Sequence, residues 1–154
     1  MKTMIIGMLI IFTSLALAGT SLTLDNNIRS IGQYLSWNTA YAAAADGDTI
    51  YVYPSPYDYG SYNVDKLLTV IGVGFNPSDP QQLTSRISLY VGPASAAAEG
   101  SVFTGLHSLN SITHDFRVEC SHCQFDSWVS LKASNSVLKD CLFNSHVHVG
   151  SPPA

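Results

Sequence analysis

The stretch Ala42–Pro54, AAAADGDTIYVYP, marks the point where the pattern of the chain changes. The alanines are strong helix formers, and Gly47 lies where a left-handed residue commonly ends a helix. Thr49–Tyr53 then alternates along β-branched and aromatic residues, as a half-buried strand does. Pro54 cannot donate to a sheet ladder and ends the strand. The stretch therefore predicts a helix that runs directly into a strand.

The predicted helix extends backwards from this junction. Asp25-Asn26-Asn27 offers N-cap chemistry. Apolar residues then recur on one helical stripe, namely Ile28, Ile31, Leu35, Ala42 and Ala45. We therefore expect a linker at 19–27 and a helix at 28–45. Asp46 and Asp48 are expected to bond backbone amides at the turn that follows, rather than to form an active site.

A short repeat follows near the C-terminal end of the sequence. Cys123–Ser127 recurs as Cys141–Ser145, and Val129–Leu131 recurs at the same 18-residue offset as Val147–Val149. A repeat this short, with strand-like alternation and no internal helix, is typical of one turn of a β-solenoid and not of helical or leucine-rich repeats. We therefore expect β-coils over 46–150, followed by a tail at 151–154.

Similar spacings occur earlier in the chain. The interval from Ile50 to Leu68 equals that of the C-terminal repeat, and the interval from Leu68 to Ile87 is one residue longer. These spacings predict that the three residues stack on one another inside the solenoid. The segment 92–115 keeps the composition but shows no register, so its faces stay unassigned.

The run from the amphipathic helix through AAAADGDTIYVYP to Val-Ile-Gly-Val-Gly at 70–74 resembles the start of right-handed parallel β-helix proteins of the pectate-lyase-like superfamily. The later C-x-F repeats resemble the rungs of such proteins, so the resemblance covers about 28–150. It implies an all-β right-handed parallel β-helix with an N-terminal capping α-helix. It does not imply one activity, since the fold serves lyases, hydrolases, tailspikes and adhesins.

The first eighteen residues are predicted to be a signal peptide. Lys2 supplies a positive start, Met4–Leu17 is uncharged and apolar, and Ala16-Leu17-Ala18 is an A-x-A cleavage site. The alternative is an uncleaved anchor, for which the run is short. We therefore expect a secreted, periplasmic or cell-surface protein with no membrane span after cleavage.

Charged residues make up only 12% of the chain, and the net charge is −4. Nucleic acid binding calls for a basic face, so that class of partner is not expected. No second capping helix is evident at the C-terminal end. Either the short tail suffices, or the sequence is the N-terminal piece of a longer protein, which we favour because open solenoid ends need caps.

The repeat predicts an outward-facing cluster on the last coils. With Val129 and Leu131 inward, the side chains expected to face out are those of Trp128, Ser130, Lys132, His146 and His148. An exposed aromatic ring among polar groups on a flat sheet could stack on a sugar, so polysaccharide or cell-surface glycan is the expected partner. The alternative is an ordinary solvated face.

Other titratable residues carry weaker signals. His122 aligns with Asp140, so we expect a surface pair that could move protons but is more often structural. His114, Asp115 and Arg117 form the densest charged cluster. No acidic trio that could hold calcium accompanies that cluster, so neither a lyase site nor a cofactor is expected within this chain.

The three cysteines are Cys120, Cys123 and Cys141. The 18-residue offset predicts that Cys123 and Cys141 stack inward on neighbouring coils, at a separation that suits a disulfide. We favour buried free thiols stacked in a ladder over the disulfide. A metal site is not expected, because the chain lacks a second C-x-x-C or a finger-like histidine pair.

Two functions are consistent with these patterns. The first is a non-catalytic, secreted or cell-surface module that presents a rigid face, for example to glycans. The second is the N-terminal part of a polysaccharide lyase or glycoside hydrolase whose active site lies on later coils.

Overall fold

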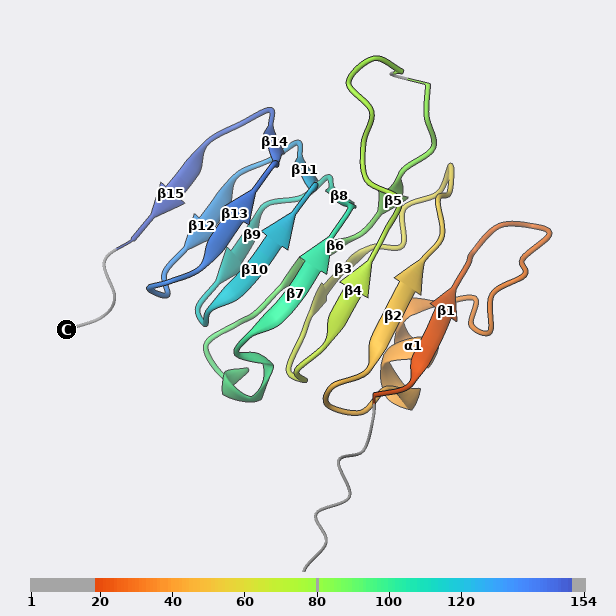
Figure 1. The fold of residues 1–154 in the computed structure, drawn as a ribbon, viewed down its shortest axis with the longest axis horizontal. Coiled ribbons are helices and arrows are strands. Elements are labelled where there is room, and N and C mark those ends of the chain that lie inside the picture. The colour runs from red at the N-terminus through yellow and green to blue at the C-terminus, as the bar shows by residue number, and fades with distance from the viewer. Residues whose placement is uncertain (1–18, 80, 151–154) are drawn as a thin grey trace, which may run out of the picture.

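The computed structural model describes residues 19–79 and 81–150, so the predicted signal peptide and the tail at 151–154 lie outside the described residues. The structure is mostly β, and every strand pairing in it is parallel. Figure 1 shows one wide sheet in front of the remaining strands, with the helix behind its first two strands. The fold is therefore a set of stacked parallel sheets with one helix.

The wide sheet has six strands, in the order β1 (Ser21–Leu24), β2 (Thr49–Val52), β4 (Thr69–Ile71), β7 (Ser101–Thr104), β10 (Val118–Ser121) and β13 (Val137–Lys139). A four-stranded sheet contains β5 (Ser85–Arg86), β8 (Leu106–Ser108), β11 (Gln124–Phe125) and β14 (Leu142–Phe143). A three-stranded sheet contains β9 (Ile112–His114), β12 (Val129–Leu131) and β15 (Val147–Val149). β3 (Ser61–Asn63) pairs with β6 (Ser88–Tyr90), and a 3-10 helix spans Ala96–Ala98.

The register of the last turns confirms the predicted 18-residue repeat. Phe125 pairs with Phe143, and Val129 pairs with Val147. The segment that could not be assigned from the sequence forms the preceding turn, β7 to β9. The interval between paired residues is one residue shorter here, because Gln124 pairs with His107 and Val129 with Ile112. The last three turns therefore each contribute one strand to each of three sheets.

The stacking predicted for the first turns, Ile50 on Leu68 and Leu68 on Ile87, was wrong. Ile50 pairs with Val70 and not with Leu68, and Val70 in turn pairs with Phe103. Ile87 lies just before β6, and β6 pairs with β3. The physical reason is that the first turns carry long loops, including the one that stands out between β4 and β5 in Figure 1. Equal spacing along the sequence therefore does not give equal position in the stack.

The predicted linker and helix also need correction. Residues 21–24 are not linker but the first strand, in which Leu22 pairs with Ile50. The helix α1 covers only Trp37–Ala43, and its N-cap is Ser36. Ile28, Ile31 and Leu35 are exposed, with relative accessibilities of 90%, 78% and 65%, respectively.

Local side-chain chemistry explains why the helix starts late. The Asp25 carboxylate accepts the backbone N–H groups of Asn27 at 3.0 Å and Ile31 at 3.1 Å. Such a side-chain turn competes with helical hydrogen bonds for the same amides. The short helix still covers the first strands, because Trp37 is 1% exposed and its ring stacks on Tyr62 of β3 at 5.8 Å.

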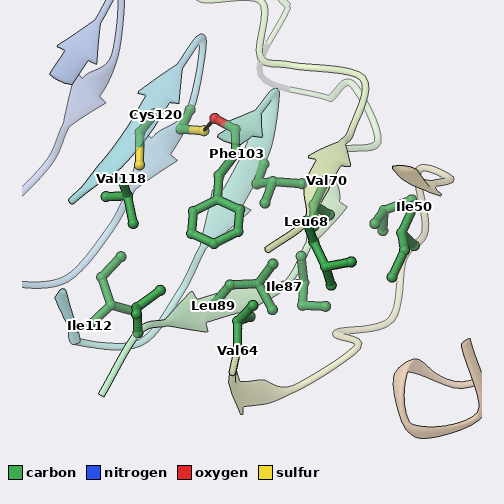
Figure 2. Close-up of a cluster of buried hydrophobic side chains, with 14 of the residues drawn as sticks. Ile50, Val64, Leu68, Val70, Ile87, Leu89, Phe103, Ile112, Val118 and Cys120 are labelled. Carbon is green, nitrogen blue, oxygen red and sulfur yellow. Dashed lines mark hydrogen bonds between the residues drawn. The ribbon is translucent and has the colours of Figure 1, made fainter. Parts of the chain in front are cut away.

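The core runs as a column between the sheets. Figure 2 shows inward side chains from successive turns in contact with one another, among them Ile50, Leu68, Val70, Leu89, Phe103 and Val118. Val129 and Leu131 point inward as predicted, with 1% and 5% of their surface exposed. On the last described turn the equivalent Val147 and Val149 are 39% and 71% exposed.

The two aspartates of the opening stretch stabilise the turn, as predicted. Asp48 accepts the backbone N–H of Thr20 at 2.6 Å and that of Ala45 at 2.7 Å. Asp46 accepts the N–H of Leu67 at 3.0 Å. These bonds connect α1, β2 and the segment before β4. Within residues 19–79 and 81–150, α1 is too short to be a membrane-crossing helix and no other helix qualifies.

Candidate functional site

A polar hollow lies on the outer face of the four-stranded sheet. The segments 75–79 and 81–84 of the loop between β4 and β5 form one wall. The cleft has a volume of about 250 Å³, and the side chains that matter for its chemistry are Gln82, Thr84, Arg86, His107 and Gln124. Three of these come from β5, β8 and β11, so consecutive strands of one sheet position the floor of the cleft.

His107 is the centre of a hydrogen-bonded row in this cleft. Its Nδ1 lies 2.8 Å from Thr84 Oγ1, and its Nε2 lies 2.7 Å from Asp126 Oδ2. A carboxylate can only accept, so Nε2 carries a proton, and in the neutral ring Nδ1 then accepts from the Thr84 hydroxyl. With 9% of its surface exposed, the imidazole is held in one orientation by both neighbours.

Asp126 is itself held by side chains of its own turn and of the next one. Its Oδ1 accepts from Gln124 Nε2 at 2.9 Å and from Asn144 Nδ2 at 2.8 Å. Burial raises the pKa of Asp126, but the hydrogen bonds from Gln124, His107 and Asn144 together outweigh burial and leave the pKa below its ordinary value. The carboxylate is therefore charged at neutral pH and accepts the Nε2–H of His107.

Two other polar atoms of the cleft have unused hydrogen-bonding capacity. Among the described residues, Arg86 Nε and Gln82 Oε1 are buried and have no hydrogen-bond partner. The Arg86 head group is anchored through Nη1, which donates to the Pro56 carbonyl at 3.2 Å. Buried groups without a partner destabilise the folded chain by about 1–3 kcal/mol each. Both atoms lie beneath the surface of the cleft, so a ligand there would meet the other polar atoms of these partly exposed side chains.

The predicted glycan-binding residues lie on the three-stranded sheet instead. Ser130 pairs with His148, which confirms the predicted register. Trp128 is 42% exposed, and His146 and His148 are exposed. Ser130, however, is 2% exposed, so the prediction that it is accessible was wrong. It is packed between the neighbouring strands β9 and β15.

Lys132, the last of the predicted glycan-binding residues, is exposed and forms an ion pair. Its Nζ lies 2.9 Å from Asp115 Oδ1. The two side chains border a shallow hollow of about 340 Å³ together with Tyr90 and Thr113. The predicted face therefore exists as an exposed surface, but Ser130 is buried in it and Lys132 is paired with Asp115.

The predicted surface pair is present. His122 Nε2 lies 3.9 Å from Asp140 Oδ2, and the two side chains are 63% and 59% exposed. At this exposure solvent screens the attraction strongly, so the pair contributes little to stability.

The predicted charged cluster at 114–117 does not form. His114 points into the core and is fully buried, while Asp115 faces Lys132. Arg117 Nε lies 4.0 Å from Glu99. His114 ends β9, whereas Asp115 and Arg117 lie in the bend between β9 and β10, so these neighbouring residues have different environments.

Cys123 and Cys141 are neighbours on successive turns, as predicted, and all three cysteines are free thiols in this structure. Burial raises the pKa of the Cys120 thiol. The hydrogen bond between Cys123 and Cys141 lowers the pKa of Cys141 to about 7, against the opposing effect of burial. In the part of the chain that the structure describes, no three His, Cys, Asp or Glu side chains are grouped so that they could hold a metal ion.

The row formed by Thr84, His107 and Asp126 could not be found from sequence spacing. Thr84 and His107 are 23 residues apart, and His107 and Asp126 are 19 apart, so neither interval matches the repeat. The only available signal was the period-two placement of His107 on a strand in the segment without assigned register. No protein-family model, no curated protein and no solved structure matches this chain.

Proposed function

We propose that the chain is a right-handed parallel β-helix module of a secreted or cell-surface protein, and that it binds a glycan without transforming it. The stacked parallel sheets and the 17- and 18-residue registers of the last turns support the β-helix. The pectate-lyase-like resemblance supports its handedness. The signal-peptide pattern of residues 1–18 supports export.

The cleft on β5, β8 and β11 is the observation that carries the glycan proposal. Sugar hydroxyls both donate and accept hydrogen bonds, and the partly exposed side chains of Arg86, Gln82 and Gln124 that line the cleft offer donors and acceptors. Phe75 and Leu142 also line the cleft and provide apolar surface for the C–H face of a sugar ring. A few fixed polar groups among apolar ones are typical of ligand sites.

The size of the cleft limits what enters it. At about 250 Å³ it is smaller than the ~300 Å³ at which pockets for drug-sized ligands begin. One sugar residue of a longer polysaccharide would enter, while its neighbours extend along the rigid sheet surface. We therefore expect the protein to bind polysaccharides or oligosaccharides, and to bind a free monosaccharide only weakly.

The experiment measures retention of the protein on a panel of immobilised polysaccharides. Arg86→Ala and Gln82→Ala are expected to weaken binding about tenfold each, because each removes one hydrogen bond to the ligand. Lys139→Ala is the control for Arg86→Ala, since it also removes one positive charge, from an exposed position on β13. Lys139→Ala is expected to bind as the unmodified protein does.

Trp128→Ala separates the cleft from the three-stranded face. If this variant loses binding while Arg86→Ala keeps it, the ligand lies on the face that includes Trp128, and the cleft assignment fails. Absence of retention on every polysaccharide would overturn the glycan proposal itself. New reducing or unsaturated ends in the incubated polysaccharides would overturn the non-catalytic part.

A second candidate function follows from the Thr84–His107–Asp126 row. A hydroxyl, an imidazole and a carboxylate in sequence are the parts of a nucleophilic acyl-transfer site. Thr84 Oγ1 would attack an ester carbonyl and pass its proton to His107 Nδ1, while Asp126 stabilises the resulting imidazolium. His107 would return the proton to the leaving alcohol, and water would then hydrolyse the acyl-threonine by the same route.

This esterase candidate has its own test. Acetate release from an acetylated polysaccharide or from p-nitrophenyl acetate would be measured for the unmodified protein, Thr84→Ala, Thr84→Ser and His107→Gln. Activity that is lost in Thr84→Ala and retained in Thr84→Ser supports a hydroxyl nucleophile. No release above the buffer rate by the unmodified protein would eliminate the candidate and leave the row as a structural support of the cleft.

A further inference from the structure

We propose that Cys141 and Cys123 form a thiol–disulfide exchange pair, in which Cys141 reacts first with an external disulfide and Cys123 then completes an intramolecular disulfide. This proposal does not depend on the glycan site.

The backbone holds the two cysteines at equivalent positions of successive turns. Gln124 pairs with Leu142, and the N–H of Leu142 donates to the carbonyl of Cys123 at 2.9 Å. Each cysteine directly follows a corner residue with left-handed backbone, His122 or Asp140. The side chains therefore leave the backbone in the same direction from strands about 4.8 Å apart. That spacing lies inside the Cα separation of roughly 4.4–6.8 Å that a disulfide spans.

The two thiols are close enough for each to shift the pKa of the other. Cys120, in contrast, lies on β10 with Leu138 as its partner on the following strand. It therefore has no cysteine at the equivalent position of the next turn. Register thus selects Cys123 and Cys141 as the pair from the three thiols.

Exposure decides the order of reaction. Cys123 is 1% exposed, whereas Cys141 is partly exposed at the surface of the last described turn. Only Cys141 can meet a disulfide that approaches from solvent. The neighbouring Cys123 side chain lowers the pKa of Cys141 to about 7, which favours its thiolate. Thiolate is the nucleophile in such exchanges, and a pKa near the ambient pH is close to optimal.

The two steps balance as ordinary thiol–disulfide exchange with a low-molecular-weight disulfide as the oxidant. The Cys141 thiolate attacks one sulfur of that disulfide, whose S–S bond breaks and releases a first thiolate, which takes up a proton from solvent. Cys123 then loses its proton and attacks Cys141 Sγ, which releases the second thiol. Both cysteines are oxidised, and one external disulfide is reduced to two thiols.

The test uses oxidised glutathione as the oxidant, with the native protein and intact-mass and peptide mass spectrometry after alkylation. The unmodified protein is expected to yield a Cys123–Cys141 crosslink with Cys120 left as a thiol. Cys123→Ser is expected to retain one glutathione on Cys141, because the resolving thiol is gone. Cys141→Ser is expected to take up none, and Cys120→Ser is the matched control that still forms the crosslink.

Three results would overturn the proposal. The first is a crosslink that includes Cys120, the second is a glutathione adduct on Cys141→Ser, and the third is an unmodified protein that stays reduced after prolonged incubation. A pulse of iodoacetamide on the native, unmodified protein provides a readout that needs no variant. It is expected to label Cys141 first and thereby block the crosslink, and first labelling of Cys123 or Cys120 would contradict the order of reaction.

Discussion

His122 and Asp140 occupy the same corner of successive turns, and both have left-handed backbone, with φ angles of 51° and 52°. Gly105 occupies that corner in the preceding turn, with φ of 67°. The pairing of Ser121 with Lys139 and with Thr104 places the three residues in one row. Left-handed backbone disfavours most L-residues by roughly 1–2 kcal/mol. The corner therefore restricts which residues can follow each strand of the six-stranded sheet.

Substitution of His122 should reveal this restriction. His122→Val is expected to lower the free energy of unfolding by about 1–2 kcal/mol, because a β-branched residue tolerates the left-handed region poorly. His122→Asn is expected to change it little, since asparagine adopts this conformation readily. Urea denaturation followed by circular dichroism measures both. Equal stability of the two variants would show that the corner backbone relaxes and does not select the residue.

Gly105 has a second constraint at the same corner. A Cβ at this position would lie 2.6 Å from the Gly72 carbonyl oxygen and 2.7 Å from Gly74 N. Gly105→Ala is therefore expected to destabilise the chain by more than the left-handed strain alone, that is, by more than about 1–2 kcal/mol. The control is Gly47→Ala, where φ is +86° and no atom lies within 4 Å of the added Cβ. A comparable loss in the two variants would show that β4 and the corner move apart without cost.

The sequence predicted the last turns well because their connections have equal length. The same 18-residue interval relates Phe125 to Phe143 and Val129 to Val147, and the structure has the same pairs. The first turns could not be predicted this way, because the interval from Val70 to its partner Phe103 is much longer than that from Ile50 to Val70. Loops of different length destroy the periodicity while the strands still stack.

The helix was predicted too long for a different reason. The apolar stripe that contains Ile28 and Ile31 has helical spacing, but the Asp25 carboxylate binds amides of this segment, and both isoleucines are exposed among the described residues. Periodicity alone does not show which apolar residues find a partner. The cleft was missed because its row joins Thr84, His107 and Asp126 across unequal loops, whereas the cysteine pair was found because it follows the repeat.

The burial of His114 is expected to make the folded chain less stable in mild acid. Its ring is 0% exposed, neither ring nitrogen has a partner among the described residues, and burial lowers its pKa from 6.5 to about 4. The unfolded chain therefore binds a proton at His114 below about pH 6.5, while the folded chain does so only near pH 4. Stability falls as the pH drops through this window, by a few kcal/mol at about 1.4 kcal/mol per pKa unit.

The measurement is the free energy of unfolding of the unmodified protein and of His114→Phe at pH 7 and pH 4.5. Phenylalanine keeps a ring beside Phe103, whose centroid lies 5.8 Å from that of His114, and it removes the titration. The variant is expected to lose less stability between the two pH values. The exposed His146→Phe serves as control and should keep the full acid dependence. An unchanged pH dependence in His114→Phe would exclude His114 as its origin.

Protonation of the Asp48 carboxylate is expected to cause a second loss of stability, at lower pH. The N–H groups of Ala45 and Thr20 stabilise its carboxylate and, against burial, lower its pKa below 3.8. The stabilisation is present above the unfolded pKa and disappears as the pH falls through the lower folded pKa, which is below the His114 window.

Asp48→Ala is expected to lower the free energy of unfolding at pH 7 by about 3 kcal/mol, because it leaves two amides without their charged acceptor. Asp46→Ala removes only the bond to Leu67 at an exposed position and should lower it by about 1 kcal/mol. Equal losses measured by urea denaturation would contradict the assignment of Asp48 as the residue that joins α1 to β1 and β2.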